Sequence, residues 1–177
     1  MTGFFRRILR AAVLDKRAYE EVEADRRATG QAVGVVLLAS IAGGIGSPGL
    51  GLSNLQALAA GVVGALVGWM AWAALTYLIG TRFLPEPQTR ADVGELLRTI
   101  GFASAPGLLR VLGAIPVIGL SIYAIASIWM LLAMIVAVRQ ALDYTSTSRA
   151  LGVCVLGWAP SLVVAAIIGI VFAPSVS

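Results

Sequence analysis

The chain has 177 residues, of which 59% are hydrophobic and only 12% are charged, and its mean hydropathy is +0.91. Since a soluble globular domain carries about 25% charged residues, this composition excludes a soluble domain and predicts an integral membrane protein. Histidine is absent and cysteine occurs once, which excludes histidine-ligated metals, Ser-His and Cys-His nucleophilic pairs and an intrachain disulfide. We therefore expect no enzyme, no cofactor and no metal site.

Residues 1–27 form a charged N-terminal segment ahead of the membrane domain. Within residues 4–13, apolar side chains recur at helical spacing, and Arg6, Arg7 and Arg10 fall on the opposite face. This pattern predicts an amphipathic helix at the lipid interface, where the arginines attract anionic headgroups. The alternative is a helix packed against a partner subunit. A short surface helix is expected in the charged stretch that follows, at residues 15–29.

The remaining residues, 28–177, predict an all-α membrane bundle of five transmembrane helices. A helix needs about 20 apolar residues to cross the hydrocarbon core, and three long runs of this part of the chain contain no charge. A fifth, less regular span lies between the first two of these runs. The expected spans are residues 28–45, 53–79, 93–112, 116–138 and 150–172.

The first two spans contain small-residue pairs and aromatic residues with separate expected roles. Glycines four residues apart let another helix backbone approach closely, and aromatic side chains gather at lipid contacts and at the membrane interface. The glycines expected at helix packing faces are Gly30, Gly34, Gly64 and Gly68, and the aromatic residues expected at lipid are Trp69, Trp72 and Tyr77.

The third span has an irregular sequence. Asp92 followed by Glu95 predicts a capping box that starts a helix near Val93, and Glu95 and Arg98 are close enough on a helix to pair. Pro106 removes a helix hydrogen bond, so it predicts a kink or two half-helices. The backbone groups that the break frees need neighbouring protein or water. The candidate functional or packing residues are Glu95, Arg98, Phe102, Pro106 and Arg110.

The distribution of basic residues predicts the orientation in the membrane. Seven of the 13 lie before the first span, and the loops at 80–92 and 139–149 carry most of the others. Because basic residues are enriched on the cytoplasmic side, we expect a cytoplasmic N-terminus and an external C-terminus.

A family resemblance rests on short motifs in the second half of the chain. These are R-x-x-G-F-A-x-A-P at residues 98–106, then Trp129, the sequence RQAL at 139–142, and Trp158. They resemble the bacterial branch of the Yip1 domain family. The resemblance implies a five-span helical protein of the bacterial inner membrane with a cytosolic N-terminus.

Eukaryotic members of that family are linked to vesicle trafficking and bind prenylated small GTPases. That role does not transfer, because this chain lacks the long hydrophilic N-terminal domain and its tyrosine-glycine-proline motif. The bacterial branch has no settled biochemical activity, so the resemblance implies the fold rather than the function.

Two functions remain open from the sequence. The first is a scaffold or accessory subunit that packs with other membrane proteins, with a second copy or with lipids. The alternative is a small transporter or channel whose site, at the broken third span, uses Glu95, Arg98 and Arg110. Catalytic residues are not expected. Intramembrane proteolysis would need a Ser-His pair, two membrane aspartates or a metal motif, and the sequence has no histidine and no aspartate within a predicted span. No nucleic-acid-binding stripe is visible, so nucleic acid is not an expected partner.

Overall fold

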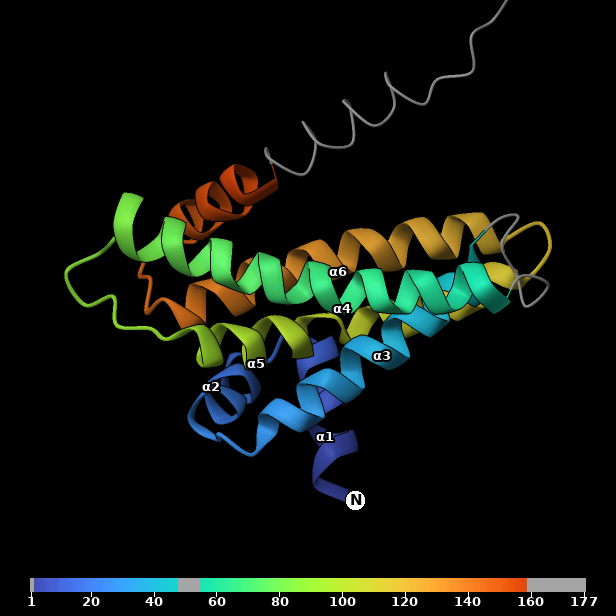
Figure 1. Cartoon of the computed structure of the whole chain (residues 1–177), viewed down its shortest axis with the longest axis horizontal. Helices are drawn as coiled ribbons and strands as arrows, with labels where there is room; N and C mark the ends of the chain where they lie inside the picture. The colour runs from blue at the N-terminus through green and yellow to red at the C-terminus, as the bar shows by residue number, and fades with distance from the viewer. Residues whose placement is uncertain (1, 48–54, 159–177) are drawn as a thin grey trace, which may run out of the picture.

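The structure is a computed structural model that describes residues 2–47 and 55–158, and these residues form helices and no strand (Figure 1). The N-terminal part contains α1 (Thr2–Ala12), α2 (Lys16–Ala24) and α3 (Ala28–Gly46). The central part contains α4 (Leu55–Leu78), a π-helical turn η1 (Ile79–Phe83) and α5 (Val93–Ala103). A 3₁₀ helix η2 (Ala105–Ala114) and α6 (Gly119–Ala141) follow, and residues 147–158 are again helical.

Three of these helices are long and apolar enough to cross a membrane, namely α3, the combined α4 and η1, and α6. The chain is therefore an all-helical membrane protein, as its composition indicates. The three helices correspond to the expected spans at 28–45, 53–79 and 116–138. Of the expected span at 150–172, residues 150–158 are helical, and residues 159–172 lie outside the described residues.

The expected third span, 93–112, consists of α5 and η2. Asp92 and Glu95 form the predicted capping box and α5 begins at Val93, so both predictions are confirmed. The α-helix ends at Ala103, and the 3₁₀ helix that follows has Pro106 in its first turn. Proline is tolerated there because the first N–H groups of a helix have no partner within it. The 3₁₀ helix η2 has ten residues, which is longer than the three or four residues usual for such a helix.

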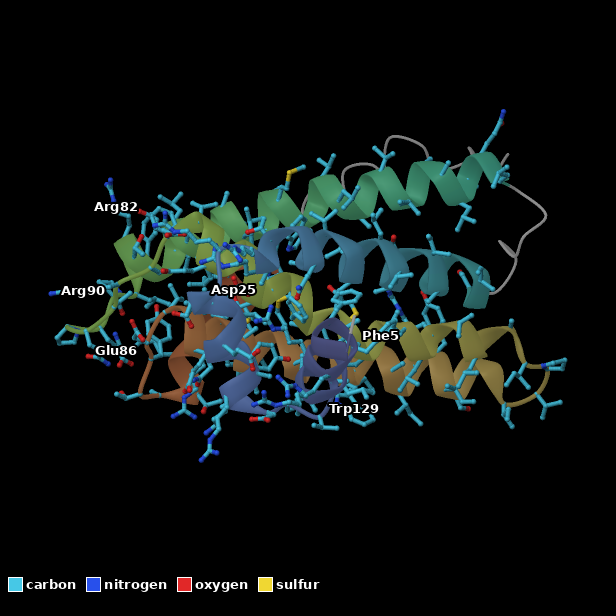
Figure 2. All side chains as sticks on the ribbon, turned by 90° about the horizontal axis from the view of Figure 1, so that it is seen from below. Phe5, Asp25, Arg82, Glu86, Arg90 and Trp129 are labelled. Carbon is cyan, nitrogen blue, oxygen red and sulfur yellow. The ribbon has the colours of Figure 1, made fainter. Side chains whose placement is uncertain are left out.

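The long helices lie side by side along the long axis of the molecule, with α5 and η2 among them (Figure 1). Charged side chains gather at one end, where Arg82, Glu86 and Arg90 lie (Figure 2). We call this the charged end, formed by α2 and residues 82–92 and 139–149. The opposite end, formed by Gly46 and residues 113–118, is called the uncharged end.

Glycines let three helices meet backbone to backbone at the uncharged end. A Cβ atom on Gly46 would collide with the backbone oxygen of Arg110, and one on Gly113 would collide with the oxygen of Gly46. A Cβ atom on Gly119 would in turn collide with the oxygen of Gly113. These glycines therefore fix how closely α3, η2 and α6 approach one another.

The glycine pairs expected at packing faces do not make these contacts. Among the described residues, a Cβ atom on Gly30, Gly64 or Gly68 would meet no atom within 4 Å, and one on Gly34 would meet only the ring of Phe4, at 3.6 Å. The four-residue spacing is therefore a poor guide to which glycines are close-packed in the described part of the chain, because it ignores where neighbouring helices cross.

The core near the charged end is built from large side chains of α2 and α5. Tyr19, Leu96, Ile100 and Phe102 are fully buried. The Tyr19 hydroxyl donates a hydrogen bond of 2.9 Å to the backbone oxygen of Ala11, so this residue also joins α1 to α2. The packing attaches the N-terminal helices firmly to the membrane bundle.

Candidate functional site

Arg98 is buried and joins α5 to the C-terminus of α2. Its Nε donates hydrogen bonds to the backbone oxygens of Val22, at 3.1 Å, and Glu23, at 3.0 Å, and Nη2 also donates to Glu23. The last carbonyl groups of a helix lack intrahelical partners and carry partial negative charge, so a cation is favourable here. Arg98 therefore caps α2 from a distant part of the chain.

Glu95 does not form the expected pair with Arg98. Its side chain accepts a hydrogen bond of 2.8 Å from the Asp92 backbone N–H within the capping box, and none of the ion pairs in the described residues joins it to Arg98. The acidic side chain is oriented toward the start of its own helix, whereas the guanidinium reaches across to α2.

Phe102 and Pro106 are packing residues in this structure. Both are fully buried, and the Phe102 ring meets the Phe4 ring edge-on with centroids 6.5 Å apart. Phe102 thus holds α1 against α5, and Pro106 begins η2 close to α3 and α6.

Two of the three arginines expected at lipid headgroups form ion pairs within the protein. Arg7 pairs with Glu21 and Asp25, both at 2.9 Å, and Arg10 pairs with Asp15 and Glu21, both at 2.8 Å. The hydrogen bond from Arg7 lowers the pKa of the Glu21 carboxyl group, and that from Arg10 lowers the pKa of the Asp15 carboxyl group. These pairs attach α1 to α2.

The other face of α1 is open. Arg6 is exposed, and Phe5, Leu9 and Val13 form an apolar stripe in which each side chain is more than half exposed. Figure 2 shows Phe5 at the edge of the N-terminal helix. The spacing of four residues places the three apolar side chains on one helical face.

The ionisation of Glu23, at the charged end, is strongly disturbed. Burial, together with the charges of Asp143 and Glu95, raises the pKa of its carboxyl group to about 7. Arg98 acts in the opposite direction. Glu23 therefore takes up a proton near neutral pH, although its sequence surroundings give no sign of this.

A second arginine, Arg110, lies on η2 toward the uncharged end and turns inward. Its Nη2 donates a hydrogen bond of 3.1 Å to the backbone oxygen of Ala39, and Nε donates one of 3.3 Å to that of Gly107. Its guanidinium carbon also lies 5.6 Å from the centre of the Tyr123 ring, which is a cation–π distance.

Arg110 lines a cavity of about 550 Å³ that is bounded by α3, α4, η2 and α6. Its walls are mainly apolar, with a few hydroxyl groups. Among the candidate residues of the third span, Arg110 alone lines it; Glu95 and Arg98 do not. The larger side chains of the wall are Val36, Leu58, Trp69, Trp72, Ile100, Tyr123, Met130, Met134 and Trp158.

The tryptophans of α4 are placed differently from the lipid contacts expected for them. Trp69 is buried, and its indole N–H donates a hydrogen bond of 3.1 Å to the Leu97 backbone oxygen. Trp72 meets Trp158 with ring centroids 5.9 Å apart. Periodicity could not assign these roles, because α4 is apolar on all sides.

The role of Tyr144, which contacts the end of η1 at the charged end, was also not predicted from the sequence. Its hydroxyl lies 2.7 Å from the Leu84 oxygen and 3.0 Å from the Gly80 oxygen, and burial raises the pKa of the phenol to about 12. Nearby, Glu86 accepts hydrogen bonds from the backbone N–H and the hydroxyl of Thr145. A lone tyrosine in a polar connection gives no local signal of such contacts.

Within the described residues, no three histidine, cysteine, aspartate or glutamate side chains gather in a way that could hold a metal ion. The chemistry of the site is therefore that of an inward-facing guanidinium beside an apolar cavity, together with arginines that hold helix ends.

Comparison with known proteins identifies the family to which the chain belongs. The model of the Yip1 domain matches residues 13–169, which is most of the chain and includes α2 to α6. Neither a curated protein nor a solved structure gives a significant match. Since the match extends over the membrane helices, the Arg98 cap and the Arg110 cavity alike, this chain belongs to the Yip1 domain family.

Proposed function

We propose that this protein is a non-enzymatic scaffold or accessory subunit that packs against other membrane proteins and against lipids. The observation that carries the proposal is the open surface of α4. This helix buries only Trp69, Ala73 and Thr76, and no side chain of residues 55–68 is buried against the described residues.

The open part of α4 has the composition of a helix–helix interface. Gly64 lies on the exposed part of this helix, between Gly61 and Gly68, which also line the cavity next to α3, and a Cβ atom on any of the three would meet no described atom within 4 Å. Glycine in a helix costs about 1 kcal/mol relative to alanine, and small residues are typical of the surfaces where membrane helices meet. The occupant that we propose is a transmembrane helix of another protein that presents small residues.

Transport is less well supported by the contacts around α5. Glu95 and Arg98, two of the three polar residues on which that alternative relied, hold the ends of α5 and α2. They do not line the cavity.

Site-specific photo-crosslinking in native membranes tests the partner helix. A photoreactive amino acid at position 64 should form an adduct with a transmembrane helix of another protein. Ala60→Ile, one turn away on the exposed surface and outside the cavity wall, should abolish that adduct by blocking close approach. The same amino acid at position 132, on the exposed face of α6, should react mainly with lipid. Adducts from position 64 that stay within the chain, at residues 159–177, would contradict the proposal.

Orientation and location are part of the same proposal. The basic residues at the charged end favour a cytoplasmic N-terminus, and the motif at residues 98–106 favours a bacterial inner membrane protein. In a Cys154→Ala background, an impermeant thiol reagent added to intact cells should label Val117→Cys at the uncharged end. It should not label Gln88→Cys at the charged end, and the reverse pattern would invert the orientation.

The N-terminal helix supplies a contact with lipid in this proposal. Phe5 and Leu9 of α1 and Val13 just after it are exposed apolar residues, and Arg6 is an exposed arginine beside them. An apolar stripe next to a cation suits the boundary between acyl chains and anionic headgroups.

A further inference from the structure

The cavity beside η2 contains a cation for which the chain provides no counter-charge. All nine acidic residues of the chain are among the described residues, and the ion pairs that these residues form involve Arg7, Arg10 and Arg149, not Arg110. Segments 48–54 and 159–177 contain no aspartate or glutamate. The side chains of this protein therefore supply no carboxylate to Arg110.

The Arg110 guanidinium lies inside the end of a membrane span. It donates a hydrogen bond to the oxygen of Ala39 and lies against Gly43, three residues before the last residue of α3, Gly46. At 1.5 Å per residue this is about 4.5 Å inside the end of a candidate membrane span. An arginine inside a span is unfavourable unless it is paired or solvated, and it marks a functional site by default.

The space occupied by the guanidinium depends on two glycines. A Cβ atom on Gly43 would lie 2.9 Å from Nη2 and 3.0 Å from Cζ of Arg110. A Cβ atom on Gly107 would lie 3.4 Å from the same Nη2 and 2.7 Å from the sulfur of Met130. Because Gly43 and Gly107 have no side chains, the Arg110 guanidinium has room between them, and the Arg110 side chain can turn inward.

The guanidinium retains unused donors that face an apolar cavity. An arginine has five N–H groups, and Arg110 makes two hydrogen bonds with described residues. The indole Nε1 of Trp72, which also lines the cavity, is buried and has no hydrogen-bond partner among the described residues. A planar guanidinium fork matches the oxygens of a phosphate, and the tryptophan and methionine side chains suit a hydrocarbon chain.

We propose that this cavity binds an anionic lipid. The headgroup phosphate accepts hydrogen bonds from Arg110, and one acyl chain lies against Trp69, Trp72 and Met130. The site goes beyond the scaffold role proposed above. It rests on Arg110 and its missing counter-charge, whereas the partner helix rests on the exposed residues of α4 around Gly64. The two surfaces share Gly61 and Gly68 at the cavity wall, and the Arg110 and Gly43 variants test the lipid site alone.

Quenching of tryptophan fluorescence by brominated lipids tests the proposal on the full chain. Trp69, Trp72 and Trp158 line the cavity, and Trp129→Phe removes the signal from the half-exposed tryptophan of α6. The protein is reconstituted in phosphatidylcholine vesicles that contain increasing fractions of phosphatidylglycerol brominated in its acyl chains. Half-maximal quenching is expected at a fraction about tenfold lower than with brominated phosphatidylcholine, as for a charge-assisted hydrogen bond.

Three variants separate the site from general attraction to a basic protein. Arg110→Gln should abolish the preference for the anionic lipid. Gly43→Ala should do the same with the charge retained, because the new methyl group displaces the flexible end of Arg110. Arg82→Gln removes one exposed charge at the other end and should leave the preference unchanged.

Several outcomes would overturn the proposal. Equal quenching by anionic and zwitterionic lipid in the unmodified site would mean that no anionic lipid is bound. An undiminished preference in Arg110→Gln would place the lipid elsewhere. If inorganic phosphate added to the vesicles erased the preference, the site would bind phosphate itself, and the assignment to a lipid would be wrong.

Discussion

Replacing Arg98 should release the C-terminus of α2 from the membrane bundle. In Arg98→Ala, the backbone oxygens of Val22 and Glu23 lose the donors that now cap them. A hydrogen bond to a charged group contributes about 1.5–3 kcal/mol, so leaving two such acceptors without a donor at a buried position gives about 3–6 kcal/mol of local destabilisation. Arg98→Lys keeps the charge but not the fork, and about half of this loss is expected.

Hydrogen–deuterium exchange in nanodiscs measures this effect where it acts. The amides of α2 should exchange faster in Arg98→Ala, by roughly two orders of magnitude or more if exchange follows local opening, since 1.4 kcal/mol corresponds to a factor of ten. Arg90→Ala is the matched control, because Arg90 is exposed at the same end (Figure 2). Its effect should remain within about 0.5 kcal/mol.

If α2 exchanged in Arg98→Ala as slowly as in Arg90→Ala, the hydrogen bonds from Arg98 would not hold this helix. The buried packing of Tyr19 and Val22 would then be sufficient by itself.

Three further predictions concern other parts of the fold. Gly46→Ala should destabilise the protein by several kcal/mol in an unfolding titration, because its Cβ would collide with the backbone of η2, whereas Gly30→Ala, whose Cβ meets no described atom within 4 Å, should be neutral or stabilising. The pKa of Glu23 is about 7 in the folded protein, above its ordinary value of 4.5, so its contribution is fully present below pH 4.5 and is lost as the pH rises through 7; protection of the α2 amides, after correction for the intrinsic pH dependence of exchange, should therefore fall from pH 4.5 to 7 and then level off, and Glu23→Gln should reduce that change. Val117 is fully exposed with a φ of 74°, so Val117→Gly should raise the thermal midpoint by relieving about 1 kcal/mol of backbone strain, and a lowered midpoint would contradict this.

The features that the sequence predicted correctly are local ones. The capping box needs only Asp92 and Glu95, three residues apart, and its hydrogen bonds form within one turn. The long apolar helices follow from composition alone, because a membrane span is defined by its length and its lack of charge.

The roles that could not be predicted depend on contacts between distant residues. Arg98 binds carbonyl groups 75 and 76 residues earlier in the chain, so its nearer neighbour Glu95 was the only partner that helical spacing could suggest. Spacing likewise selected Gly30 and Gly64, whereas the close contacts fall at Gly46 and Gly113, where helices cross.

The sequence by itself determined that this is an all-helical membrane protein with its charge at one end, because the hydrophobic effect and the cost of burying charge act on composition and order along the chain. Only the tertiary structure decided what each arginine does. Arg7 and Arg10 bind the carboxylates of α2, Arg98 closes a helix end, and Arg110 faces a cavity without a counter-charge. The same side chain takes these different roles because its partner is set by how the helices pack, and a guanidinium binds whichever acceptors that packing brings within reach.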